Sequence, residues 1–295
     1  MKTLMHGIIP AMVTPLLGDE ELNEPSLRRL VNFLIDGGVH GLLPLGTTGE
    51  AWALARGQRR RIIEVVVDEA RGRVPVYAGT GAPSTREVIS LNRDAAEVGG
   101  VAAVTVITPF FVTPSQQELY EHYARIAEAS PLPVILYNNP RFTGLNLNVE
   151  TVERLAHHGN IIGIKDSSAN LTQAASYVTA CPAGFAVFMG ADTQVLAGLV
   201  YGCAGAVVTT GNAAPRIAVE IYEKYSAGDI AGARAAQERL ALLRNAINMG
   251  TFPLVVKEAL NLMGMDVGPC HRPIAPLSDE SRAKLRDVLK QMGVL

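Results

Sequence analysis

The stretch Ile161-Ile162-Gly163-Ile164-Lys165-Asp166-Ser167-Ser168 is a short apolar run that ends in a single lysine. An apolar run bounded by polar residues is typical of a strand that is buried on both faces of a parallel sheet. The pattern therefore predicts a strand over 161–165 with Lys165 at its carboxyl end. Desolvation there favours a neutral amine, which can attack a carbonyl carbon. Taken alone, the segment favours the alternative, a lysine that extends its ammonium into solvent.

The composition limits the classes of protein to which the chain can belong. Hydrophobic residues make up 48% of the 295 residues and charged residues 18%. These values favour one large globular α/β domain over a disordered chain. The formal net charge of −2 gives no general attraction for nucleic acid or for anionic lipid. Since no apolar run reaches membrane-spanning length, we expect neither a nucleic-acid partner nor a membrane partner.

The cysteines and histidines form no metal-binding or disulfide pattern. Cys181, Cys203 and Cys270 stand far apart without a CxxC pair, which favours a reducing, cytoplasmic location over a disulfide framework. The six histidines form neither an HxH nor an HExxH pattern, and these are the spacings that zinc sites use. We therefore expect no metal site.

Short apolar runs alternate with amphipathic stretches, and this alternation is typical of repeated βα units. Two capping sequences, Ser84 with Glu87 and Ser115 with Glu118, each predict the start of a helix after a strand. Eight βα units predict a (β/α)8 TIM barrel, an α/β fold, over residues 1–224. The predicted strands cover 7–13, 41–45, 74–78, 102–107, 134–137, 161–165, 186–189 and 204–208.

An open, doubly wound sheet is the alternative fold. That fold would carry a glycine fingerprint after its first strand, and residues 10–17 contain none. The strand pattern stops after about residue 214, and residues 225–295 are predicted to form a C-terminal helical extension. Helices are predicted over 214–225, 230–248, 252–263 and 279–292.

The ends of the predicted strands collect residues that can act on one small substrate. The strand over 41–45 leads into Gly46-Thr47-Thr48-Gly49-Glu50, whose N–H groups and hydroxyls can bind a carboxylate or a phosphate. Glu50 is expected to brace this turn. The strand over 134–137 ends at Tyr137, a candidate proton carrier beside Lys165. Taken alone, the two motifs also fit an ordinary turn and a core tyrosine.

Together these motifs resemble the pyruvate-dependent class I aldolases of the dihydrodipicolinate synthase and N-acetylneuraminate lyase family. The resemblance covers essentially the whole chain and implies a (β/α)8 barrel with a helical extension. It also implies a homotetramer, assembled as a dimer of dimers. The matching residues are Gly46-Thr47-Thr48-Gly49-Glu50, Thr108-Pro109-Phe110-Phe111, Tyr137-Asn138, Pro140, Thr143-Gly144, Gly163-Ile164-Lys165, Gly190-Ala191-Asp192, Gly205-Ala206-Val207, Pro253 and Lys257.

The resemblance also implies a role for each matched residue. Lys165 corresponds to the lysine that forms a covalent imine with a 2-oxo acid, so that no metal or organic cofactor is required. Tyr137 corresponds to the catalytic proton carrier, and Thr47 to its relay partner. Thr47 and Thr48 correspond to the pair that binds the substrate carboxylate. The other expected substrate contacts are Gly46, Val207, Gly190, Asp192 and Arg141.

Two positions depart from the synthase pattern. Phe111 stands where synthases carry a tyrosine that a neighbouring subunit lends to the proton relay. Phe142 stands where they place an arginine for the carboxylate of the second substrate, and Arg141 lies one position early. The run over 251–258 is closer to the 2-oxo-3-deoxy sugar acid aldolases and dehydratases of the same family.

We therefore predict a class I lyase that acts on a small 2-oxo acid and an aldehyde, by reversible aldol cleavage or by dehydration. A 2-oxo-3-deoxy sugar acid or a related hydroxy-oxo acid is the expected substrate. One alternative is a 4-hydroxy-tetrahydrodipicolinate synthase, which joins pyruvate and aspartate semialdehyde. The other alternative is a catalytically idle protein that only binds a 2-oxo acid.

Overall fold

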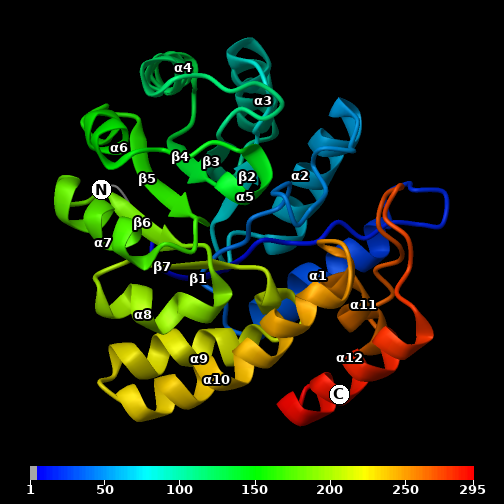
Figure 1. The fold of residues 1–295 in the computed structure, drawn as a ribbon. Coiled ribbons are helices and arrows are strands. Elements are labelled where there is room, and N and C mark those ends of the chain that lie inside the picture. The colour runs from blue at the N-terminus through cyan, green and yellow to red at the C-terminus, as the bar shows by residue number, and fades with distance from the viewer. Residues whose placement is uncertain (1–4) are drawn as a thin grey trace.

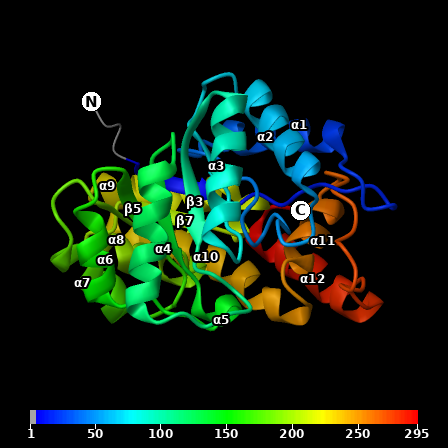
Figure 2. The ribbon, with the colours of Figure 1, turned by 90° about the horizontal axis from the view of Figure 1, so that it is seen from above.

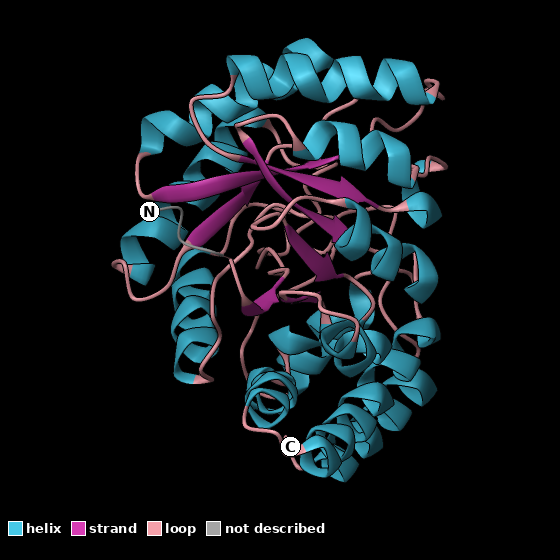
Figure 3. Cartoon of the chain, turned by 90° about the vertical axis from the view of Figure 1, so that its left-hand side faces the viewer, coloured by secondary structure: helices cyan, strands magenta, loops and turns pink. Residues whose placement is uncertain are grey.

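The structure is a computed structural model that describes residues 5–295. Seven parallel strands form one sheet in the order β1-β7-β6-β5-β4-β3-β2. They gather at the centre of the molecule with helices outside them (Figure 1), and Figure 3 shows helices around the strands. The strands are β1 (Gly7–Pro10), β2 (Val76–Gly79), β3 (Val101–Ile107), β4 (Val134–Asn138), β5 (Ile161–Asp166), β6 (Ala186–Met189) and β7 (Gly205–Val208).

The edges of this sheet, β1 and β2, are joined through the segment that the sequence predicts as a strand over 41–45. Leu43 forms a parallel bridge with Ala11, directly after β1, and Leu42 forms one with Val76 of β2. The segment therefore stands in the place of an eighth strand and closes the barrel. The (β/α)8 fold is confirmed.

The prediction of a regular strand over 41–45 is nevertheless wrong, because its pairing is limited to isolated bridges. Two residues explain the short pairing. Pro44 has no N–H to donate to a neighbouring strand, and Leu45 has a φ of +63°, which ends the extended conformation. The chain thus turns early into the loop that carries Thr47.

Helices follow the strands and cover the outside of the barrel. Ser115 and Glu118 form the complete capping box that was predicted for the start of α4. At α3 the Oγ of Ser84 accepts a hydrogen bond from the N–H of Glu87 at 3.3 Å. The helices of the barrel are α1 (Glu24–Asp36), α2 (Arg56–Ala70), α3 (Thr85–Val98), α4 (Gln116–Ala129), α5 (Pro140–Thr143), α6 (Val149–Ala156), α7 (Leu171–Ala180) and α8 (Val195–Val200).

The last part of the chain is helical, as predicted. Figure 2 shows α11 and α12 on the side of the barrel opposite α6 and α7. The predicted helix over 230–248 ends earlier than expected, in a 3-10 turn over Ile247–Met249. The elements are α9 (Pro215–Ser226), α10 (Ile230–Ala246), α11 (Leu254–Leu262) and α12 (Asp279–Met292).

Two groups of buried apolar residues hold the fold together. The larger group fills the space between the strands and the helices. The smaller group lies inside the barrel and includes Ile9, Leu43, Tyr77, Phe188 and Val207. Within residues 5–295, no helix has both the length and the apolar character that a membrane crossing requires.

Candidate active site

The carboxyl ends of β4 and β5 bring Tyr137 and Lys165 together. The parallel register pairs these two residues, and the Nζ of Lys165 lies 4.0 Å from the centroid of the Tyr137 ring. Both side chains are almost completely buried, with exposed fractions of 4% for Lys165 and 5% for Tyr137. Gly163 allows β5 to pack closely on β6, because a Cβ atom there would lie 2.4 Å from the carbonyl oxygen of Ala186.

The amine of Lys165 has no polar partner among the described residues, where it forms neither an ion pair nor a hydrogen bond. The carboxylate of Asp166, next in sequence, is bound by Ser168 Oγ at 2.7 Å and by Asn138 Nδ2 at 2.9 Å. Burial raises the pKa of Asp166, against the opposing effect of those hydrogen bonds. The Lys165 nitrogen is therefore held by packing and is available to a substrate.

The hydroxyl of Tyr137 lies among several hydrogen-bonding side chains. Asn139 Nδ2 donates a hydrogen bond to it at 2.8 Å, and Thr47 Oγ1 lies 3.4 Å away. Burial alone would raise the pKa of Tyr137, but the positive charge of Lys165 and hydrogen bonds with Thr47, Asn139 and Ser167 lower it below its ordinary value. A buried phenol with a lowered pKa is suited to passing protons to and from a reacting group.

The two adjacent threonines face different strand ends. Thr47 reaches Tyr137 of β4, whereas Thr48 Oγ1 lies 3.1 Å from the Oγ1 of Thr209, which follows β7. Their loop is anchored from the opposite side, because Thr14 Oγ1 donates a hydrogen bond to the carbonyl oxygen of Gly49 at 2.6 Å. The loop thus presents hydroxyls and backbone N–H groups at the mouth of the barrel.

Glu50 does not use its carboxylate to brace its own turn, contrary to the expectation from the sequence. The carboxylate is fully buried and forms an ion pair with the Nζ of Lys257 in α11 at 2.9 Å. It also accepts a hydrogen bond from the backbone N–H of His271 at 2.7 Å. Lys257 Nζ donates a second hydrogen bond to the carbonyl oxygen of Pro269. The loop over 46–50 is thereby joined to the C-terminal extension.

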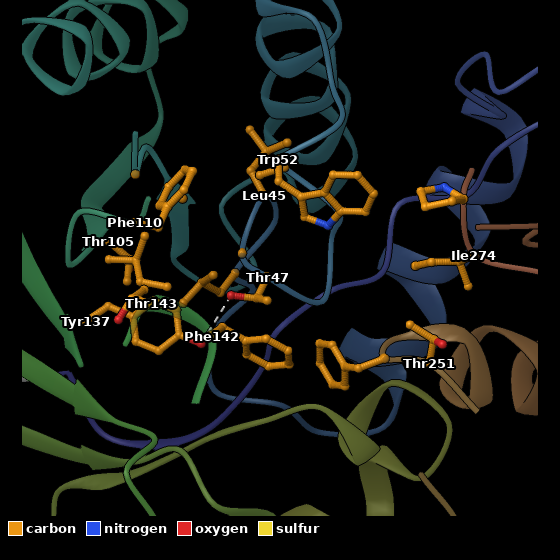
Figure 4. Close-up of a pocket in the computed structure, with 18 residues that line it drawn as sticks. Leu45, Thr47, Trp52, Thr105, Phe110, Tyr137, Phe142, Thr143, Thr251 and Ile274 are labelled. Carbon is orange, nitrogen blue, oxygen red and sulfur yellow. Dashed lines mark hydrogen bonds between the residues drawn. The ribbon is translucent and has the colours of Figure 1, made fainter. Parts of the chain in front are cut away.

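A cavity of about 440 Å³ opens beside Tyr137 and Thr47 (Figure 4). Gly46 also lines this cavity, but Lys165 and Thr48 do not. Aromatic and aliphatic side chains form most of its wall, and apart from Phe142, whose position the sequence analysis singled out, they were not predicted as substrate contacts. They include Trp52, Phe110, Phe142, Phe252 and Ile274.

Four other predicted substrate contacts lie outside the wall of this cavity. The Asp192 carboxylate accepts hydrogen bonds from the backbone N–H groups of Thr209 and Thr210, at 3.2 and 2.7 Å. Arg141 is exposed, and its guanidinium lies 5.5 Å from the centroid of the Phe142 ring.

Gly190 and Val207 are the other two predicted contacts that do not line the cavity. The N–H of Gly190 bonds the carbonyl oxygen of Asp166 at 2.7 Å, and Val207 packs inside the barrel. Substrate contacts of Asp192, Arg141, Gly190 and Val207 stay predictions. Within residues 5–295, no group of three or more His, Cys, Asp or Glu residues is arranged to hold a metal ion.

The amino-acid sequence is similar to one family of proteins along nearly its whole length. The model of the Dihydrodipicolinate synthetase family matches residues 4–292. The 4-hydroxy-tetrahydrodipicolinate synthase of Methanothrix thermoacetophila is 41% identical over 293 residues, which are 99% of this chain and 98% of that protein.

Solved structures share the fold over the same length. The prophage protein YagE from E. coli K12, of the dihydrodipicolinic acid synthase family and in complex with pyruvate, has a TM-score of 0.95 at 32% identity, covering 99% of this chain and 100% of that chain. A monomeric dihydrodipicolinate synthase variant has a TM-score of 0.96 at 33% identity, with coverages of 99% and 98%. The likeness therefore includes both the barrel and the helical extension.

Proposed function

Because the chain belongs to the dihydrodipicolinate synthetase family, we propose that it is a lyase in which Lys165 forms a covalent imine with a 2-oxo acid of the pyruvate type. One observation carries this proposal: the Lys165 amine is buried, has no polar partner and lies 4.0 Å from the Tyr137 ring. The similar YagE structure, which holds pyruvate, supports this type of substrate. The protonated imine is itself the electron sink, so the proposal requires no further cofactor.

Each group near the lysine has a part in the proposed reaction. The hydroxyls and N–H groups of the loop around Thr47 and Thr48 bind the substrate carboxylate. The Lys165 nitrogen attacks C2, and Tyr137, with Thr47 beside its hydroxyl, passes protons as water leaves. The imine then loses a proton from C3, and the resulting enamine attacks the carbonyl carbon of an aldehyde. Hydrolysis of the new imine releases the product, and the reverse sequence cleaves it.

Formation of 4-hydroxy-tetrahydrodipicolinate from pyruvate and aspartate semialdehyde is the first candidate for the overall reaction. Full-length relatives from different organisms carry the name of that synthase, at identities of 41%, 38% and 39%. These similarities favour the synthase over the sugar acid lyase that the sequence motifs had favoured.

Cleavage or dehydration of a 2-oxo-3-deoxy sugar acid or a related hydroxy-oxo acid remains the second candidate, because of two local observations. Phe142, and not an arginine, lines the cavity, whereas Arg141 lies outside it. In addition, Phe111 is fully exposed and has no hydroxyl to lend to a proton relay. An idle protein that only binds a 2-oxo acid is disfavoured, because binding alone does not require a buried amine beside a tyrosine of lowered pKa.

Borohydride reduction in the presence of pyruvate tests the proposal. The intact mass should rise by the mass of the reduced pyruvyl group, and peptide mapping should place that group on Lys165. A modified protein in which Lys165 is unchanged would contradict the assignment. Parallel assays with aspartate semialdehyde and with 2-oxo-3-deoxy sugar acids then decide between the two candidate reactions.

We also propose that the protein assembles as a homotetramer. Phe111 is 100% exposed and Val112 is 50% exposed, in the loop that follows β3. Exposed apolar side chains that lie together are typical of a protein interface. Sedimentation analysis should therefore detect a tetramer, and a monomer at every concentration would refute this proposal. The cytoplasmic location inferred from the cysteines likewise stays a prediction.

A further inference from the structure

We propose a second ligand site on the outside of the barrel: the groove between α3 and α4 binds a small organic bisphosphate, a compound with two phosphate groups on a short carbon frame. The two helices are neighbours in the structure (Figure 1), and the groove has a volume of about 480 Å³. None of its residues lines the cavity beside Tyr137, so this site is independent of the proposed function. The lining residues are Thr85, Arg86, Ile89, Ser90, Arg93 and Arg125.

Arg86 and Arg93 place positive charge at two levels of α3. Ser90 lies four residues after the first and three before the second, so all three residues share one side of the helix. At a rise of about 1.5 Å per residue, the backbone positions of the two arginines lie about 10 Å apart along the helix axis. Arg125 adds a third guanidinium group from α4. A ligand with two phosphates on a carbon frame therefore finds a cation for each.

The three arginines of the groove have no anionic partner in the described part of the chain. Within residues 5–295, none of their side chains forms an ion pair or a hydrogen bond, and no carboxylate lines the groove. The planar guanidinium fork matches two oxygens of a phosphate group, which makes arginine well suited to bind phosphate. Like charges in one groove also repel one another, and a multiply charged anion replaces this repulsion with attraction.

The carboxylates of α3 interact with α2, the other neighbouring helix, and not with the arginines of the groove. Asp94 Oδ2 accepts a hydrogen bond from Arg56 Nε at 2.6 Å, and Glu97 Oε2 accepts one from Arg60 Nη1 at 2.8 Å. Glu87, the third carboxylate of α3, contributes to the raised pKa of Arg56 and so also lies towards α2. This division of charge leaves the groove on the α4 side with a net positive charge.

The uncharged residues of the wall favour a phosphate ester. Thr85 is the first residue of α3, where the helix dipole and unpaired N–H groups favour an anion. Its Oγ1 lies 2.9 Å from Nδ1 of His122. Burial lowers the pKa of His122 to about 4, so this ring is neutral at neutral pH and holds the hydroxyl without adding charge. Ile89 offers apolar surface to a carbon frame, which inorganic phosphate lacks.

Isothermal titration calorimetry of the full-length protein with glucose 1,6-bisphosphate tests the site. This probe has no free carbonyl group, so it cannot form an imine with Lys165. We expect a Kd at or below about 100 µM at low ionic strength, with weaker binding as salt is added. Glucose 1-phosphate and pyrophosphate should each bind at least roughly tenfold more weakly. The first has only one phosphate, and the second holds its two phosphates too close together to reach both levels of the groove.

Three variants place the binding at the groove. Arg93→Gln should weaken the binding of glucose 1,6-bisphosphate by roughly tenfold or more, because a charge-assisted contact is lost. Arg93→Lys, which keeps the charge but lacks the planar fork, should show an intermediate loss. The matched control is Arg286→Gln, which removes the same charge from an exposed arginine of α12 outside the groove. The control should keep the affinity of the unaltered protein. Because both arginines are exposed, all variants should melt at the same temperature without ligand.

Three outcomes would overturn the groove site. Glucose 1,6-bisphosphate might fail to bind more tightly than pyrophosphate, in which case the groove does not select two separated phosphates. If Arg93→Gln and the double variant Arg86→Gln/Arg125→Gln both keep the affinity, the probe binds elsewhere. If binding is lost after pyruvate has been trapped on Lys165 with borohydride, the probe occupies the barrel and not the groove. Failure of the trapping itself would contradict the proposed function alone, because the calorimetry of the variants still decides the groove site.

Discussion

Lys165 and Lys257 are both buried, with exposed fractions of 4% and 0%, but their surroundings are opposite. Lys257 has a carboxylate partner in Glu50 and a carbonyl partner in Pro269. Lys165 forms no ion pair or hydrogen bond within residues 5–295, and its Nζ lies over the face of the Tyr137 ring. A buried ammonium with fixed partners is a structural element, whereas a buried amine without them is free to make a covalent bond. The surroundings, and not burial itself, therefore distinguish the two roles.

The largest effect should come from Lys165→Ala. We expect the loss of pyruvate trapping and a fall in turnover of roughly 10⁴-fold or more, because the covalent intermediate cannot form. The folded state should persist, since Lys165 has no ion pair to lose. Intact mass after borohydride treatment and a circular dichroism melt measure the two properties. Normal trapping in this variant would invalidate the comparison of the lysines.

Tyr137→Phe removes the proposed proton carrier but keeps the ring beside Lys165. Turnover should fall by roughly 10²–10⁴-fold, the usual contribution of general acid–base catalysis. The pKa of Tyr137 is lowered, so activity in the unaltered protein should decline as the pH rises through that lowered value and the phenol loses its proton. A pH–rate profile of both proteins checks this. Turnover within a few-fold of the original would assign the proton transfer to another group.

Lys257→Met should act on stability and not on the chemistry. Removing one member of a buried ion pair leaves the Glu50 carboxylate unpaired, which typically costs about 3–5 kcal/mol of unfolding free energy. Urea unfolding measures the loss, and the double variant Glu50→Gln/Lys257→Met should recover part of it. The folded fraction should still trap pyruvate on Lys165. An unchanged unfolding free energy would show that the pair has no structural role.

The smallest effect concerns Cys270, which lies beside the Glu50 and Lys257 pair. Burial raises the pKa of this thiol to about 12, so little thiolate exists at neutral pH and alkylation should be slow. Lys257→Met should speed alkylation by roughly tenfold by promoting local opening. Lys165→Ala should leave the alkylation rate of Cys270 unchanged. The alkylation rate of the buried Cys203 should be unchanged in both variants. Mass mapping of the two cysteines gives the answer.

The sequence predicted the parts of the fold that depend on local pattern. The strand over 186–189 and the helix over 279–292 have the predicted bounds. The error at 41–45 arose because an apolar run suggested continuous pairing, while Pro44 and the left-handed Leu45 limit it to bridges. The family expected from the motifs is confirmed.

The candidate site likewise has a part that the sequence predicted and a part that it missed. Parallel strands end at one face of a barrel, so the meeting of Lys165 with Tyr137 followed from their places in sequence. The partnership of Glu50 with Lys257 joins residues 207 positions apart, and no local pattern connects them. The usable signals were the position of Lys257 directly after three apolar residues of α11 and its place among the residues that match the family. The cavity wall was missed for the same reason, since Phe252 comes from a distant part of the chain.

The C-terminal extension supplies part of the cavity wall, through Thr251, Phe252, Pro273 and Ile274, whereas the ring that lies beside the Lys165 nitrogen, Tyr137, belongs to β4 of the barrel. This separation has an evolutionary consequence. Mutations in two short segments, 251–252 and 273–274, can change the shape of the cavity while Lys165 and Tyr137, the proposed reactive amine and proton carrier, stay intact. Substrate choice and bond-making chemistry can thus be selected independently, and gene duplication followed by drift in the extension is a short route to a new metabolic role.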